Sequence, residues 1–164
     1  MNNQTRCFYI RLEPYIKDWI IKRNGVNGII DFKRGSMERD FIMLNAAKLP
    51  KGKDPDTPDD ECVAVKFHWY RGKNPVVYNY FSDSNKEELK AMLKRRFDWQ
   101  LMMDILKPSN HGCQISELVW NWMQQNNIEL NDRNFNAIIK RFQRRRNYYG
   151  IKISVRQKKS KKKG

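Results

Sequence analysis

The sequence predicts an α+β fold in which a mixed N-terminal segment and a β-hairpin precede a three-helix region that resembles a helix-turn-helix, followed by a basic tail. Three observations predict it. Apolar residues alternate in two short stretches of the first half, they recur at helical spacing in the second half, and lysines crowd the C-terminus. With 164 residues and 40% hydrophobic composition, the chain can bury a core without disulfides.

The N-terminal segment begins with a short strand over residues 7–12, where aromatic and β-branched side chains alternate. Pro14 suits the first turn of a helix, which we expect to end near Arg23. A second strand is predicted at residues 29–32. Ser36 is a suitable N-cap for a further helix that ends before the proline at position 50.

Residues 51–61 are rich in proline and aspartate, which predicts an exposed loop. Beyond it, residues 63–70 alternate between apolar and polar side chains, and residues 76–81 are again β-rich. The two stretches are separated by the five residues 71–75. This pattern predicts a β-hairpin.

Three helices follow. Ser84 and Glu87 form a capping-box pattern that predicts a helix over residues 84–106. An apolar stripe predicts a second helix over 114–126, and Asn131 as N-cap predicts a third over 131–148. Alternation over residues 151–155 indicates a short final strand.

The predicted regions are therefore residues 1–50 (strand and helix segment), 51–61 (acidic Pro-rich loop), 62–83 (β-hairpin), 84–155 (helical, DNA-binding-like region) and 156–164 (flexible basic tail).

Charge is concentrated at the C-terminal end. The formal net charge is +15 and the isoelectric point about 9.9. Between Lys140 and Lys163 there are twelve cations and no carboxylate. A field of this sign attracts polyanions, so the sequence favours a nucleic-acid partner.

The last two predicted helices, joined by a short connection, match the helix-turn-helix plan, in which the second helix enters the major groove. Candidates for base contacts on that helix are Arg133, Asn134, Asn136 and Lys140. Candidates for phosphate contacts are Arg141, Arg144, Arg145, Arg146, Lys152, Arg156, Lys158, Lys159, Lys161, Lys162 and Lys163. Tyr148 and Tyr149 either stack on bases or close the core at the end of the helix.

Other interpretations fit the same residues. The helices can form a module whose solvated face happens to be basic, and backbone charge suits RNA as well as DNA. A phage structural or assembly protein with a basic end that contacts the genome or an acidic partner is the alternative from a different class. The strand at residues 7–12 followed by helices also resembles the order of a ribbon-helix-helix protein, but the insertion at 26–35 is too long for that pattern.

Nothing in the sequence favours an enzyme, a cofactor or a metal site. His68 and His111 stand alone, and the three cysteines are widely spaced. We expect a cytoplasmic protein with reduced thiols and no membrane segment. The sequence leaves a homodimer open.

Several segments resemble a group of small basic proteins carried by phages and mobile elements of gut Bacteroidales. These segments are Phe8-Tyr9-Ile10-Arg11-Leu12-x-Pro14-Tyr15 with Trp19, Arg34-Gly35-Ser36, Tyr78-Asn79-Tyr80, Arg96-Phe97-Asp98-x-Gln100 and Glu129-Leu130-Asn131-Asp132-x-Asn134-x-Asn136. The resemblance spans most of the chain. It implies a helix-turn-helix-like, DNA-binding C-terminal region in a phage or mobile-element setting.

Overall fold

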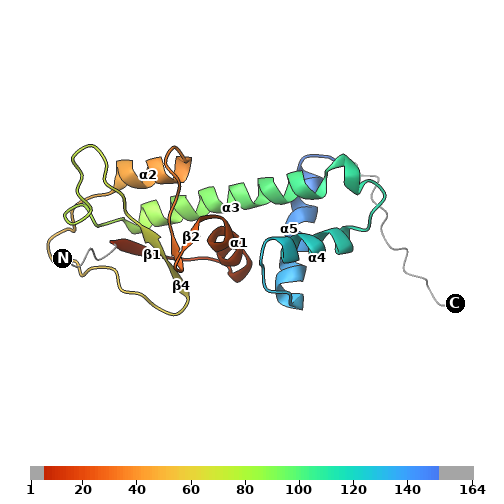
Figure 1. Ribbon diagram of the computed structural model, residues 1–164, viewed down its shortest axis with the longest axis horizontal. Coiled ribbons are helices and arrows are strands. Elements are labelled where there is room, and N and C mark those ends of the chain that lie inside the picture. The colour runs from red at the N-terminus through yellow and green to blue at the C-terminus, as the bar shows by residue number, and fades with distance from the viewer. Residues whose placement is uncertain (1–5, 152–164) are drawn as a thin grey trace. The chain divides into compact units, whose positions relative to one another are not determined.

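The computed structural model describes residues 6–151 (Figure 1). Within these residues the chain forms five α-helices and a four-stranded sheet, which confirms the predicted α+β class. The chain divides into two compact units, one up to Lys94 and one from Arg95 onward. The boundary falls inside helix α3, and the two units are described in turn.

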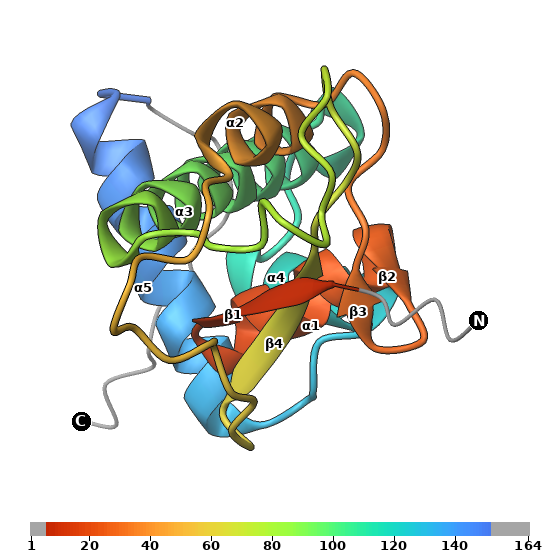
Figure 2. The same cartoon turned by 90° about the vertical axis from the view of Figure 1, so that its left-hand side faces the viewer.

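The sheet belongs to the N-terminal unit and has the order β1-β4-β3-β2. Its strands are β1 (Cys7–Arg11), β2 (Gly25–Val26), β3 (Ile29–Ile30) and β4 (Cys62–Lys66). Strand β4 runs antiparallel to β1 and parallel to β3, and Figure 2 shows β1 and β4 side by side. Phe8 and Ile10 of β1 and Val63 and Val65 of β4 are buried, as strand alternation requires.

The predicted hairpin over residues 62–83 is wrong. The first stretch does form a strand, but its partners are β1 and β3. Residues 75–77 form a turn and Tyr78 a bend instead, because Asn74 accepts local backbone hydrogen bonds. Its side-chain oxygen accepts from the Val76 N–H at 2.9 Å, and its carbonyl accepts from the Val77 N–H at 2.9 Å. Tyr80 alone pairs, through an isolated bridge to Ala47.

Two helices complete this unit, α1 (Pro14–Asn24) and α2 (Met37–Asn45). Ser36 caps α2 as predicted, since its hydroxyl accepts from the Arg39 N–H at 3.3 Å. Helix α1 contacts β2 and β3, and its buried face is Tyr15, Ile16, Trp19 and Ile20. Strand β1 pairs with β4 of the same chain, whereas the ribbon-helix-helix order pairs this strand with that of a second chain.

Residues 51–61 form an exposed loop that returns to the edge of the sheet. Asp56 accepts a hydrogen bond from the backbone N–H of Tyr9 in β1 at 3.2 Å and forms an ion pair with Lys86. Asp59 accepts from the Cys62 N–H at 2.9 Å, where β4 begins. Hydrogen bonds from the Cys62 side chain and from the backbone N–H groups of Glu61 and Cys62 lower the pKa of the Asp59 carboxyl.

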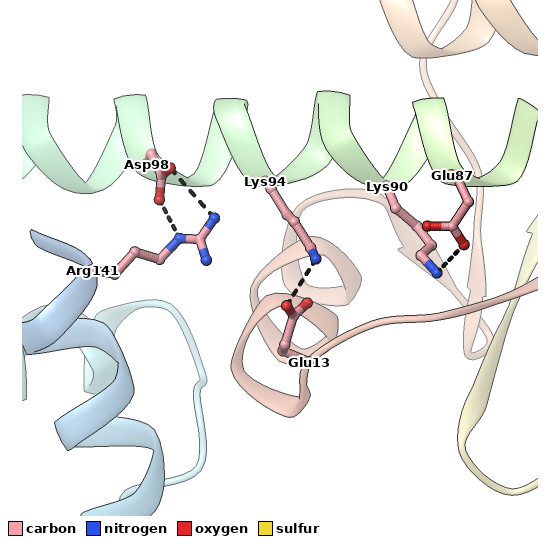
Figure 3. Close-up of polar contacts among 6 residues, drawn as sticks. All are labelled: Glu13, Glu87, Lys90, Lys94, Asp98 and Arg141. Atoms are coloured by element: carbon pink, nitrogen blue, oxygen red, sulfur yellow. Dashed lines mark hydrogen bonds and ion pairs between the residues drawn. The ribbon is translucent and has the colours of Figure 1, made fainter. Parts of the chain in front are cut away.

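Three helices follow, α3 (Asp83–Ile105), α4 (Ile115–Gln125) and α5 (Asp132–Tyr148). Their ends lie within one residue of the predicted ones. The cap of α3 differs from the prediction, because the Ser82 hydroxyl, and not Ser84, accepts from the Asn85 N–H at 3.2 Å. Midway along α3, Lys94 pairs with Glu13 at 2.9 Å, a contact within the N-terminal unit (Figure 3).

The core of the C-terminal unit lies where the end of α3 meets α4 and α5. Its fully buried residues include Phe97, Leu101, Val119, Met123, Ile138 and Phe142. Trp122 is anchored twice, by an edge-on contact with Phe97 at 5.4 Å and by donating its indole N–H to Asp104 at 2.9 Å. The apolar stripes predicted for the last two helices therefore face this core.

None of the helices within residues 6–151 is both long and apolar enough to cross a bilayer. That part of the chain also lacks any cluster of three or more side chains suited to holding a metal ion. Cys7, Cys62 and Cys113 are free thiols. Of the strand expected at 151–155, only Ile151 lies within the described residues, and it is not in a strand.

A charged cluster beside β4 makes stability depend on pH. His68 Nε2 lies 2.8 Å from Asp31 Oδ1, and Lys66 Nζ lies 2.9 Å from Asp31 Oδ2. Burial lowers the pKa of His68, and the positive charge of Arg39 lowers it further, against the opposing effect of Asp31. His68 is therefore easier to protonate in the unfolded chain than in the fold.

We expect the free energy of unfolding to fall as the pH drops below about 6.5, the ordinary pKa of histidine, until the lower pKa of folded His68 is passed. The variant His68→Asn should lose this part of the dependence. Urea unfolding between about pH 7.5 and pH 5.5 measures it, with the exposed His111→Asn as control. Parallel curves for wild type and His68→Asn would contradict the assignment.

Candidate nucleic-acid interface

The connection between α4 and α5, Asn126–Asn131, ends α4 with a Schellman motif. Asn127 takes the left-handed conformation (φ 54°) that glycine often supplies there. The Ile128 N–H donates to the Met123 carbonyl at 3.0 Å, and the Asn127 N–H donates to the Gln124 carbonyl at 3.3 Å. Ile128 is buried, so the turn is part of the core and fixes the direction in which the chain enters α5.

Asn134, one of the predicted base-contacting residues, has a structural role at the start of α5. The Asn131 side chain accepts from the Asn134 N–H at 2.8 Å, which confirms Asn131 as N-cap. Asn134 itself is only 2% exposed, and its side-chain amide donates to the Glu129 carbonyl at 3.0 Å. Asn134 is therefore a buried capping residue, and the expectation that it contacts bases is wrong.

Two predicted phosphate-binding arginines are held by a buried carboxylate. The side chain of Asp98 on α3 is 6% exposed and forms ion pairs with Arg141 and Arg145 of α5. Arg145 Nε donates to Asp98 at 2.7 Å, and Figure 3 shows Arg141 extending from α5 to the same carboxylate. Since the two arginines face one carboxylate, they position α5 and leave a residual positive charge.

Six further polar residues of α5 form one exposed face. Arg133, Asn136, Lys140, Arg144 and Asn147 follow one another at spacings of three or four residues and are all exposed, as is Gln143. Within residues 6–151, Arg133, Lys140 and Arg144 make no ion pair with a carboxylate. We call these six residues the basic face of α5.

The chemistry of the basic face suits nucleic acid. Lysine and arginine neutralise phosphate, arginine pairs with guanine edges, and asparagine and glutamine pair with adenine edges. Helical spacing alone relates Gln143 and Asn147 to the predicted candidates, although the sequence prediction did not include them. Arg146 is half-buried beside this face.

At the C-terminal end of α5, Tyr148 is 78% exposed and its C-cap Tyr149 is 62% exposed, with their rings in an edge-on contact at 5.1 Å. They do not close the core, so the stacking alternative is the one that their exposure permits. The predicted contacts Lys152, Arg156, Lys158, Lys159, Lys161, Lys162 and Lys163 lie outside the described residues.

Comparison with protein-family models, with curated proteins and with solved structures finds no match to this chain.

Replacing Asp98 with asparagine should destabilise the protein by about 2–4 kcal/mol, because it leaves two guanidinium groups without their charge partner at a buried position. Urea unfolding measures the loss. Asp60→Asn, in the exposed loop, removes the same charge and should change stability by less than about 0.5 kcal/mol. Equal stabilities for the two variants would show that Asp98 does not hold α5.

Asn134→Ala should cost about 1–2 kcal/mol, because the Glu129 carbonyl loses its donor and the first turn of α5 loses its brace. Asn136→Ala, two residues further along and exposed, should be neutral for stability within about 0.5 kcal/mol. Thermal unfolding of the pair distinguishes them. A neutral Asn134→Ala would return Asn134 to the candidates for base contact.

Proposed function

We propose that this protein binds nucleic acid, and duplex DNA in particular, through the basic face of α5. The observation that carries the proposal is the exposure of Arg133, Lys140 and Arg144 on one side of a helix whose opposite side is fixed in the core by Ile138 and Phe142. A helix presented in this way fits the width of the major groove.

The charges along α5 suggest how the helix would lie on DNA. Glu129 and Asp132 sit at its N-terminal end, whereas from Arg133 to Ile151 there is no carboxylate. Phosphate is therefore favoured towards the C-terminal half, where Lys140 and Arg144 are its partners. Arg133 and Asn136, in the first turns, are the residues we assign to base edges, as in helix-turn-helix proteins.

The C-terminal lysines would add sequence-independent attraction. We also place the protein in the cytoplasm, with reduced thiols. The sequence resemblance supports a role as a regulator of a phage or mobile element. It has no catalytic role in this proposal.

The double variant Lys140→Ala/Arg144→Ala should weaken binding to a duplex by at least about tenfold and flatten the plot of log affinity against log salt by about 1.8, because two phosphate contacts are lost. Fluorescence anisotropy over a salt series measures both quantities. The matched control is Lys33→Ala/Arg34→Ala, which removes two exposed cations from the N-terminal unit. Equal losses in both variants would mean that overall charge, and not the basic face, drives binding.

The same titration with duplex DNA, single-stranded DNA and RNA tests the choice of polymer. The proposal expects the duplex to be the form whose binding depends on Lys140 and Arg144. An effect of these two residues confined to RNA would assign the basic face to RNA.

A further inference from the structure

A second surface with the chemistry of nucleic-acid binding lies in the N-terminal unit. Residues 69–73, which we call the tip, contain Trp69, Arg71 and Lys73, and the stretch from Cys62 to Ser82 contains no carboxylate. Trp69 is 63% exposed and, within residues 6–151, makes no ring contact. The indole face of Trp69 is therefore accessible to a ligand. The carboxylate that pairs with the preceding residue, His68, is that of Asp31, and it also pairs with Lys66.

The tip is a tight two-residue turn. The Lys73 N–H donates to the Tyr70 carbonyl at 2.7 Å, and Arg71 and Gly72 between them both have positive φ, 40° and 77°. These are the signs of a type I′ turn, whose first central position favours asparagine or glycine. An arginine there costs about 1 kcal/mol in backbone strain. The guanidinium of Arg71 lies over the ring of Tyr70, 5.2 Å from its centre, and the residue is exposed and so accessible to an anionic ligand.

The base of the tip is fixed to the fold. Lys73 Nζ donates to the carbonyls of Leu44 at 2.8 Å and Ala46 at 3.0 Å, which closes the C-terminal end of α2. The ammonium group of Lys73 therefore has a structural role and is not counted among the ligand-binding cations. Trp69 and Arg71 project from a support that is already ordered, so binding through them need not order the loop.

A second cation lies near the tip. Lys48 Nζ sits over the ring of Tyr78 at 5.5 Å, and Lys73 Nζ lies 5.9 Å from the centre of the same ring. The tip thus carries an exposed indole at Trp69 and an exposed cation at Arg71, and Lys48 is a further exposed cation, linked to the tip through the Tyr78 ring that it shares with Lys73. This combination is what sequence-tolerant binding of unpaired nucleotides uses.

We propose that the tip binds single-stranded nucleic acid, with Trp69 stacking on an unpaired base and Arg71 and Lys48 meeting the neighbouring phosphates. A stack on the indole needs a free base face, which an intact duplex does not offer. This surface belongs to a different unit from the basic face and goes beyond the function proposed for α5.

The test uses the full chain, a fluorescent oligothymidine of about 20 nucleotides and a duplex of about the same length. Trp69→Ala should weaken binding to the single strand about tenfold, and Trp69→Phe, which keeps a ring, should retain most of the affinity. Duplex binding should stay within about twofold. The matched control is Trp99→Ala, since Trp99 on α3 is 62% exposed and lies in the C-terminal unit.

Arg71→Asn provides a variant that does not risk unfolding, because asparagine suits the left-handed position. It should preserve or raise the melting temperature while weakening single-strand binding several-fold and flattening its salt dependence by about 0.7. Arg34→Asn, at another exposed site of the same unit, should leave single-strand binding unchanged.

Unchanged single-strand affinity in Trp69→Ala would overturn the proposal, as would an equal loss in Trp99→Ala. Equal losses on single strand and duplex would also overturn it, because they would make the tip a duplex contact. The function proposed for α5 is tested separately, by measuring the affinity of Lys140→Ala/Arg144→Ala for the duplex. Capture of an acidic peptide in preference to the oligonucleotide would assign the tip to a protein partner instead.

Discussion

The ion pairs that Asp98 makes with Arg141 and Arg145 determine which side of α5 faces the solvent. Burial of Ile138 and Phe142 pulls the helix onto the core, but apolar contacts are non-directional and tolerate a modest rotation about the helix axis. A buried carboxylate tolerates much less, because it needs its charged partners at short range. The exposed positions of Arg133, Asn136, Lys140 and Arg144 follow from this constraint. Stability and the proposed recognition surface therefore share one interaction.

The arginines of α5 consequently have two kinds of role that composition alone does not separate. Arg141 and Arg145, four residues apart, face inward to Asp98, while Arg144 between them faces solvent. Cations near the C-terminal end also oppose the negative end of the helix dipole, which favours their placement there even without a ligand. A basic helix is for this reason only partly a binding surface. In the proposed function, affinity for nucleic acid should depend on the exposed cations of α5 and not on the total charge of the helix.

The helices were predictable from the sequence because their signals are local. Caps such as Ser36 and Asn131 and the apolar stripes act within a few residues of one another. Strand partners were not predictable: alternation identified β4, but its neighbour β1 lies some 50 residues earlier, and Asn74 turned the expected second strand into loops. Asn134 was misassigned because its helical position suggested an exposed side chain. Its place three residues after the N-cap was the signal that it could serve the helix end instead.

The exposed loop over residues 51–61 has a consequence for how the protein behaves at high concentration. Strand β1 is an edge of the sheet, and its outward N–H at Tyr9 would be free to pair with a strand of another molecule. Asp56 occupies that N–H with a carboxylate, on a segment whose prolines cannot join a ladder. The loop thereby places negative charge and irregular backbone where intermolecular β-sheet would begin. We therefore expect the loop to disfavour pairing of β1 with a strand of another molecule. Its negative charge contrasts with the cations of the basic face and of the tip.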